Sequence, residues 1–114
     1  MIIWIKKLFK KEGRPKETIQ LPILPDILEV KKFALNGWDL GETHGLSHWE
    51  RVERNGIILS MENGAIRENV NIKVVRYFAY LHDKCRLNDW ADLDHGVRSA
   101  DMLVTIRDTI LKDF

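Results

Sequence analysis

The chain has 114 residues, of which 45% are hydrophobic and 31% are charged, and its net charge is +1. This length corresponds to one small domain, and the composition is not that of an intrinsically disordered chain. The near-neutral charge excludes a chain built mainly for nucleic acid, so no nucleic-acid partner is expected. Cys85 is the single cysteine. It excludes an intrachain disulfide and fits a reducing compartment, so we expect a cytoplasmic location.

Residues 1–25 are expected to form a basic arm and a linker ahead of a helical domain over residues 26–114. The first 16 residues hold six basic side chains and one acidic one, whereas the remainder holds 12 basic and 16 acidic ones. On a helix, Ile2, Ile5 and Phe9 would share one face. We favour a short terminal helix that packs on its own domain or on a neighbouring subunit; the alternative is that residues 1–11 lie on an anionic membrane surface. Glycine and prolines between residues 13 and 25 predict an extended linker.

Four helices are predicted in the body of the chain. The first begins at Asp26 as N-cap, with Glu29 completing a capping box, and ends at Asn36-Gly37. The others are expected at about residues 43–62, 71–82 and 94–112, because apolar residues recur there at helical spacing. No strand-like alternation is present, so the predicted fold class is all-α. The recurring residues are Trp49, Val52, Gly56 and Leu59, then Val74, Val75, Phe78, Ala79 and Leu81, then Val97, Ala100, Leu103, Val104 and Leu111.

Two clusters of side chains point to metal chemistry. His44 and His48 are four residues apart, so on a helix they would face the same way, with Arg51 on the same side. His82 and Asp83 are adjacent at the end of the third predicted helix. Imidazole and carboxylate ligands suit a first-row divalent ion, which would activate water for attack on a phosphate. Arg51 would hold a phosphate oxygen, because guanidinium donors match its geometry.

Each feature also has a structural explanation. A His-Asp pair occurs by chance, and histidines four residues apart are common on a solvated helix face. His95 beside Asp94 marks no more than a helix N-terminus, where Asp94 would be the cap. The clusters gain weight when they are taken together, in their order and spacing.

Taken together, the motifs resemble a known family. His48-x-x-Arg51-Val52 followed by Leu81-His82-Asp83 is similar to the HD-domain superfamily of metal-dependent phosphohydrolases. A more specific likeness covers about residues 42–106 and includes Asp94-His95-Gly96; it is to a group of small, largely uncharacterised bacterial HD proteins. The resemblance implies a compact helical bundle of the HD-domain type.

The resemblance also implies roles for single residues. His48, His82 and Asp83 match the metal ligands of the family, and His95 matches either a residue that supports those ligands or a ligand to a second metal. His44 matches a general acid toward the leaving oxygen, and Arg51 matches a position that contacts phosphate. The catalytic set would thus be His44, Arg51 and Asp83. The implied cofactor is a divalent ion, with manganese, iron, cobalt, nickel, zinc and magnesium all left open.

The chain departs from the family pattern near its end. HD domains normally complete the site with a further aspartate in an acidic segment beyond the Asp-His-Gly motif, and nothing here matches that segment. Asp101, Asp108 and Asp113 lie on the last predicted helix, but without the motif. We therefore expect an HD bundle truncated at its C-terminus, with an open apolar face. Such faces normally mark association surfaces, so we expect a homo-oligomer, in which the N-terminal arm is a candidate to cover the gap.

Two functions follow from these residues. The first is a metal-dependent phosphohydrolase of the HD type, acting on a phosphorylated small molecule such as a nucleotide. The alternative is a non-catalytic, degenerate HD-fold module that binds a metal, a nucleotide or a protein partner. The intact histidines favour the enzyme, and the missing aspartate favours the module.

Overall fold

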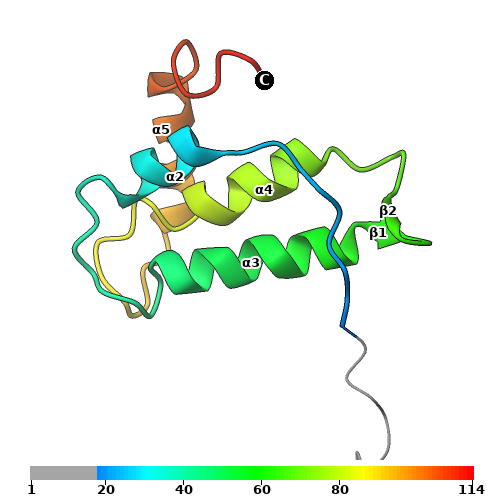
Figure 1. Cartoon of the computed structure of the whole chain (residues 1–114). Coiled ribbons are helices and arrows are strands. Elements are labelled where there is room, and N and C mark those ends of the chain that lie inside the picture. The colour runs from blue at the N-terminus through cyan, green and yellow to red at the C-terminus, as the bar shows by residue number, and fades with distance from the viewer. Residues whose placement is uncertain (1–17) are drawn as a thin grey trace, which may run out of the picture.

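Residues 18–114 are described by the computed structural model; residues 1–17, which hold the predicted basic arm, lie outside the described residues. The described chain is a small, mostly helical globule, which agrees with the predicted all-α class (Figure 1). No helix within it is long and apolar enough to cross a membrane. Its elements are α2 (Leu28–Leu35), α3 (Leu46–Leu59), β1 (Met61–Glu62), β2 (Ala65–Ile66), α4 (Ile72–Leu81) and α5 (His95–Thr105).

Helices α3 and α4 lie side by side at the centre of the fold (Figure 1). A Cβ atom at Gly56 of α3 would lie 2.6 Å from Cγ1 of Val75 on α4, so glycine allows the close approach. Across the same interface, the carboxylate of Glu53 accepts from Nε of Arg76 at 3.0 Å and from the Tyr80 hydroxyl at 2.8 Å. These contacts fix the position of α3 relative to α4.

The core lies where α2 packs on α4, and Trp49 of α3 belongs to the same buried cluster. Trp49 is completely buried, and the ring of Trp38 meets it edge-to-face with centroids 4.9 Å apart. Edge-to-face contact is a favoured arrangement for aromatic pairs. The buried hydrophobic residues of this cluster are Ile27, Val30, Ala34, Trp49, Ala79, Tyr80, Leu81 and Ile106.

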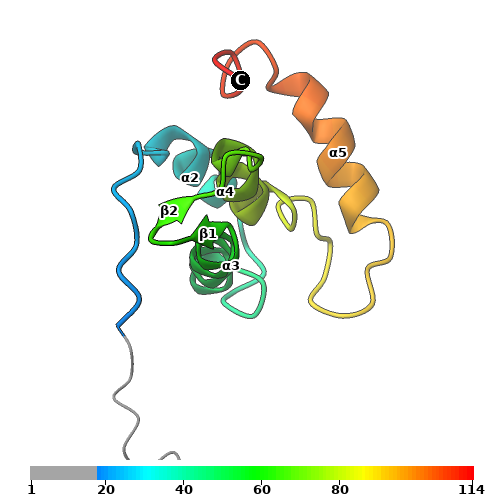
Figure 2. The same ribbon diagram turned by 90° about the vertical axis from the view of Figure 1, so that its right-hand side faces the viewer.

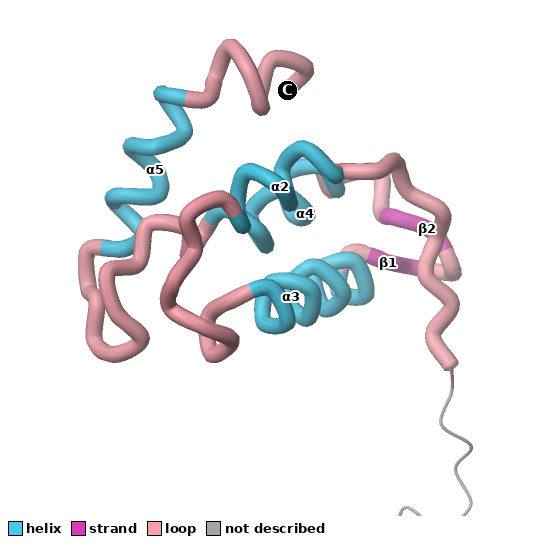
Figure 3. Tube along the Cα trace, turned by 60° about the vertical axis from the view of Figure 1, so that its left-hand side comes forward, coloured by secondary structure: helices cyan, strands magenta, loops and turns pink. Residues whose placement is uncertain are grey.

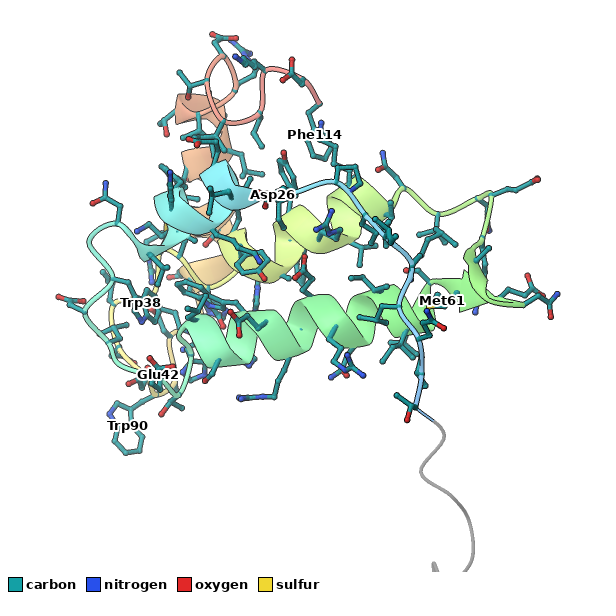
Figure 4. The ribbon with its side chains drawn as sticks, viewed as in Figure 1. Asp26, Trp38, Glu42, Met61, Trp90 and Phe114 are labelled. Carbon is teal, nitrogen blue, oxygen red and sulfur yellow. The ribbon has the colours of Figure 1, made fainter. Side chains whose placement is uncertain are left out.

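The predicted cap of the first helix is wrong. Helix α2 begins at Leu28, its N-cap is Ile27, and no side chain caps it. Ile27 holds the cap position because its side chain is buried in the core, whereas Asp26 stays exposed (Figure 4). By contrast, Asn71 caps α4 as a polar residue should, since its side chain accepts from the backbone N–H of Lys73 and Val74.

The second predicted helix ends earlier than residue 62, and a hairpin follows it. Helix α3 ends at Leu59, and Met61–Glu62 pairs antiparallel with Ala65–Ile66. Asn63 and Gly64 have φ angles of 52° and 80°, which is the backbone of a tight two-residue hairpin turn. The Asn-Gly pair therefore makes a turn between two strands, and the prediction that the helix runs to residue 62 is wrong.

The last predicted helix is also shorter than expected. Helix α5 ends at Thr105, not near residue 112, and the following residues form turns. Ile106 is buried, and the backbone N–H of Leu111 donates to its carbonyl, so the chain folds back. This return brings the ring of Phe114 to 5.1 Å from that of Tyr77 on α4. Helix α5 itself stands away from α3 and α4 (Figure 2).

Candidate metal centre

The four histidines of the chain gather where three helix ends meet. His48 lies in the first turn of α3, His82 is the C-cap of α4, and His95 is the first residue of α5. His44 comes from the loop before α3, and its ring centroid lies 5.8 Å from that of His48. Figure 3 shows these helix ends and the loops between them on one side of the molecule.

The carboxylate of Asp83 is the centre of this group, and its side chain is only 3% exposed. Its Oδ2 lies 3.2 Å from Nε2 of His48 and 3.1 Å from Nε2 of His82. Its Oδ1 lies 3.0 Å from Nε of Arg86 and 3.3 Å from Nε2 of His95. Three imidazoles and one guanidinium therefore face a single buried carboxylate.

The hydrogen bonds of His82 and His95 fix which nitrogen carries a proton. Nδ1 of His82 lies 2.9 Å and 3.0 Å from the carbonyl oxygens of Phe78 and Ala79, and Nδ1 of His95 lies against the carbonyl of Asp92. A carbonyl only accepts, so each Nδ1 must be the donor. Each Nε2 then faces Asp83, which also only accepts when ionised. Every such contact needs a second proton on the ring or a cation shared with the carboxylate.

The electrostatics of the group limit how many of these rings can be protonated. Burial lowers the pKa of His48, the opposing charge of Asp83 does not fully compensate, and the charges of His82, His44 and Arg51 lower it further. Burial also acts to lower the pKa of His82, but the hydrogen bond and charge of Asp83 outweigh it, and the net pKa is raised. Without a metal, His82 thus holds the proton more readily than His48.

Asp83 is held in its ionised form. Burial acts to raise its pKa, but the hydrogen bonds and charges of His82 and Arg86 outweigh burial and hold the pKa well below the ordinary carboxyl value. An ionised carboxylate is the form that ligates a cation. Because Arg86 engages only Oδ1, Oδ2 is left to the two imidazoles of His48 and His82.

The predicted metal ligands fit a divalent ion. One donor atom each from His48, His82 and Asp83 lie within 4.8 Å of one another. Two ligand atoms that share an ion at about 2.1 Å are about 3.0–3.4 Å apart, and the Nε2–Oδ2 separations of 3.2 Å and 3.1 Å match this. The carbonyls that hold Nδ1 of His82 give the outer-shell support typical of metal-bound histidine.

His95 lies at the centre, but on the other carboxylate oxygen. It contacts Oδ1 of Asp83 and is not one of the three residues whose donor atoms group together within the described chain. Its place therefore agrees better with a supporting group than with a third imidazole ligand to the same ion. Ser99, one turn later on α5, donates to the carbonyl of His82 at 3.0 Å and ties α5 to the same centre.

His44 and Arg51 lie beside the group without entering it. Nδ1 of His44 lies 3.1 Å from Oδ1 of Asp89, which orients the ring and leaves Nε2 available for proton transfer. Arg51 is exposed on α3, and its charge acts on His48.

Sequence reasoning gave no role to Arg86 and Asp89, which contact Asp83 and His44. The i, i+3 spacing of Arg86 from Asp83 was a usable signal, whereas the pairing of Asp89 with His44 depends on the loop after α4. Asp101, Asp108 and Asp113, which lack the family motif, are not in the ligand group: within residues 18–114, its only carboxylate is that of Asp83.

Comparisons of the chain with protein-family models, with curated protein sequences and with solved structures find no match. The functional case therefore rests on the geometry of this centre.

Proposed function

We propose that the chain is a metal-dependent phosphohydrolase of the HD type, built on an HD-type helical bundle and acting on a phosphate ester. The observation that carries the proposal is that hydrogen-bond acceptors face one another at the carboxylate of Asp83. His82 and His95 each donate the Nδ1 proton to a backbone carbonyl, and their Nε2 atoms face the ionised carboxylate of Asp83. A divalent cation held by His48, His82 and Asp83 resolves this conflict at His82 and leaves only the His95 ring to be protonated against Oδ1.

Within this proposal, the residues of the chain bind and orient the ester. A bound divalent ion lowers the pKa of water and polarises a phosphoryl oxygen, which supplies a nucleophile near neutral pH. The exposed guanidinium of Arg51 is available to hold a non-bridging phosphate oxygen. The water would lose a proton to solvent as its oxygen bonds to phosphorus, the ester P–O bond would break, and His44 would give a proton to the leaving oxygen. Asp89 orients His44 for this step through the 3.1 Å contact at Nδ1.

A second function is favoured by a different observation. Asp83 already has four positively polarised partners, and the ligand group in the described chain contains no second carboxylate. A non-catalytic module could keep this buried network for its fold and bind a metal, a nucleotide or a protein partner. The two functions differ in whether the centre holds an ion that turns over a phosphate ester.

Metal content tests the proposal first. The chain is purified without chelator and without tag histidines, and its metals are measured by elemental analysis beside a His82→Ala/Asp83→Ala variant. Near-stoichiometric metal in the wild type that is lost in the variant supports the centre. No metal, even after incubation with manganese, iron or nickel, contradicts it and favours the module.

A hydrolysis assay separates the enzyme from a metal-binding module. Asp83→Ala should abolish turnover of phosphate esters while circular dichroism shows that the helices remain. Metal binding without turnover of any ester would favour the module. Self-association stays a prediction that sedimentation at micromolar concentration tests, and the cytoplasmic location stays a prediction as well.

A further inference from the structure

An apolar groove of about 400 Å³ runs between α4 and α5. Figure 2 shows these two helices apart from one another, with the C-terminal turns above them. Phe78 is 59% exposed on its wall although it is a large hydrophobic residue. The size falls within the range of about 300–1,000 Å³ of small-molecule sites. Its apolar walls include Val74, Phe78 and Leu81 of α4, Ala100 and Leu103 of α5, and Phe114.

The groove begins at the candidate metal centre. His82, a member of the ligand group, also lines the groove, and its ring stacks on Phe78 with centroids 4.8 Å apart and planes 14° apart. On the opposite wall the lining starts with Gly96, directly after His95. The polar centre and the apolar groove therefore share one side chain and form a continuous surface.

The C-terminal turns also line the groove, through Leu111 and Phe114. Phe114 lies against Tyr77, and Nζ of Lys73 lies over both rings while it donates to the carbonyl of Asp113 at 2.7 Å. Among the described residues, His82 is the one ionisable side chain of the lining apart from the Tyr77 phenol. A ligand that fills the groove must therefore carry its charge at the His82 end and be apolar along the rest.

We infer that the groove binds the apolar part of the substrate, which makes the substrate a phosphate ester that carries an alkyl chain or a similarly apolar group. This inference rests on the proposed function, because the phosphate is assigned to the centre around Asp83. A sugar or a base would find few hydrogen-bond partners there, since the Ser99 hydroxyl already donates to the carbonyl of His82. Each methylene withdrawn from water is worth about fourfold in affinity, so even two buried methylenes give more than tenfold.

Two phosphodiesters with the same leaving group test the inference. Manganese-loaded wild-type protein is assayed with octyl 4-nitrophenyl phosphate, below its micelle concentration, and with ethyl 4-nitrophenyl phosphate. The octyl ester should have a kcat/KM at least about tenfold higher, with the difference in KM. Because nitrophenolate leaves in both cases, a difference between the esters reports on the alkyl group and not on the chemistry.

Variants of the groove test whether the preference for the octyl ester arises in the groove. Ala100→Trp fills the groove from an exposed position of α5, and Leu103→Glu places a charge in its wall. Both should bring the octyl-to-ethyl ratio of kcat/KM close to one. Thr105→Trp is the matched control, since Thr105 is exposed on α5 and does not line the groove. It should keep the ratio of the wild type.

The failures of the two proposals are distinguishable. Turnover of both esters at equal efficiency overturns the groove inference and leaves the phosphohydrolase standing. If neither ester is hydrolysed, the proposed function fails, and calorimetry with octylphosphonate and ethylphosphonate then tests whether the groove binds alkyl groups. Tighter binding of octylphosphonate that Ala100→Trp abolishes supports the groove inference. Equal binding of the two phosphonates overturns it. A dimer that Ala100→Trp dissociates, without any octyl preference, overturns it in favour of a second copy of the chain in the groove.

Discussion

Nε2 of His48 on α3 lies 3.2 Å from Oδ2 of Asp83, which directly follows the C-cap of α4. This contact joins two helices whose packing is fixed farther along by Glu53, Arg76 and Tyr80. The candidate centre is therefore positioned by the core of the fold and not by a separate loop. Changes at the centre should affect both metal binding and stability, and changes in the helix interface should reach the centre.

Asp83→Asn should remove the metal and destabilise the metal-free protein. The substitution leaves Arg86 and the imidazoles of His48, His82 and His95 facing a neutral amide in a nearly closed site. Breaking a buried charge pair in this way costs about 3 kcal/mol. The free energy of unfolding is measured by urea denaturation in the presence of chelator, and metal content by elemental analysis.

Asp101→Asn is the control for this variant, because Asp101 is exposed on α5 and lies outside the ligand group. It should keep the metal and change stability by no more than about 0.5 kcal/mol. A wild-type metal content in Asp83→Asn would show that the carboxylate is not a ligand. An unchanged urea midpoint would show that its ion pairs add nothing to the fold.

Asp89→Asn should lower turnover without loss of the metal. The carboxylate of Asp89 meets Nδ1 of His44 and acts on the reaction only through that ring. Removal of such an orienting partner typically costs about 10–100-fold in activity. The expected change is in kcat, because the His44 ring loses the contact that orients it. Equal loss of activity and metal would instead assign Asp89 a structural part in the centre.

Local signals were enough to predict part of this fold and centre. Helix α4 was expected within one residue of its bounds, because the apolar residues of this segment repeat at helical spacing. His48, His82 and Asp83 were expected together from their motifs, and their donor atoms do meet. These features depend on neighbours in the sequence or on a pattern of residue types.

Other features depend on contacts that a sequence pattern does not contain. The strands beside Asn63-Gly64 have two residues each, which is too short for an alternation to be visible. The end of α5 is decided by the burial of Ile106 and by the meeting of Phe114 with Tyr77. The pairing of Asp89 with His44 joins two loops that the sequence could not place together.

Acid should destabilise the metal-free protein through Asp83. The pKa of this carboxyl is held low because His82 and Arg86 outweigh the effect of burial. A lowered folded-state pKa gives stability that is complete above the unfolded value of about 3.9 and is lost as the pH falls through the folded value. Below about pH 4, the free energy of unfolding should fall more steeply than in Asp83→Asn, by up to about 1.4 kcal/mol per pH unit.

Near neutral pH, His82 and His48 have opposite effects on how the stability of the metal-free protein depends on pH. The raised pKa of His82 gives stability that is present below about pH 6.5 and lost as the pH rises through the folded value. The lowered pKa of His48 gives stability that is complete above about pH 6.5 and lost as the pH falls. The free energy of unfolding, measured by urea denaturation with chelator, should therefore change only slightly with pH in this range. Below about pH 4, an equal fall of this free energy in wild type and Asp83→Asn would contradict the role of Asp83.

Asn71→Ala should destabilise the protein by about 1 kcal/mol. The Asn71 side chain accepts from the backbone N–H groups of Lys73 and Val74 at 3.1 Å and 3.3 Å, which otherwise have no partner in the first turn of α4. Asn69→Ala is the control, because Asn69 is exposed and lies before the helix. Equal urea midpoints for the two variants would show that the cap is not significant for stability.

Gly56→Ala should destabilise the protein even though alanine is the better helix former. The gain in helix propensity is about 1 kcal/mol, whereas an added Cβ would lie 2.6 Å from Cγ1 of Val75, a β-branched side chain that moves little. Overpacking of this kind costs about 1–3 kcal/mol, so the net change should be a loss.

Val75→Ala in the same chain removes the obstructing methyl groups. The double variant should then be more stable than the sum of the two single changes predicts, because the two residues are in contact. A Gly56→Ala protein that is more stable than wild type would show that α3 and α4 can separate slightly at no cost, and that glycine is not needed for their close approach.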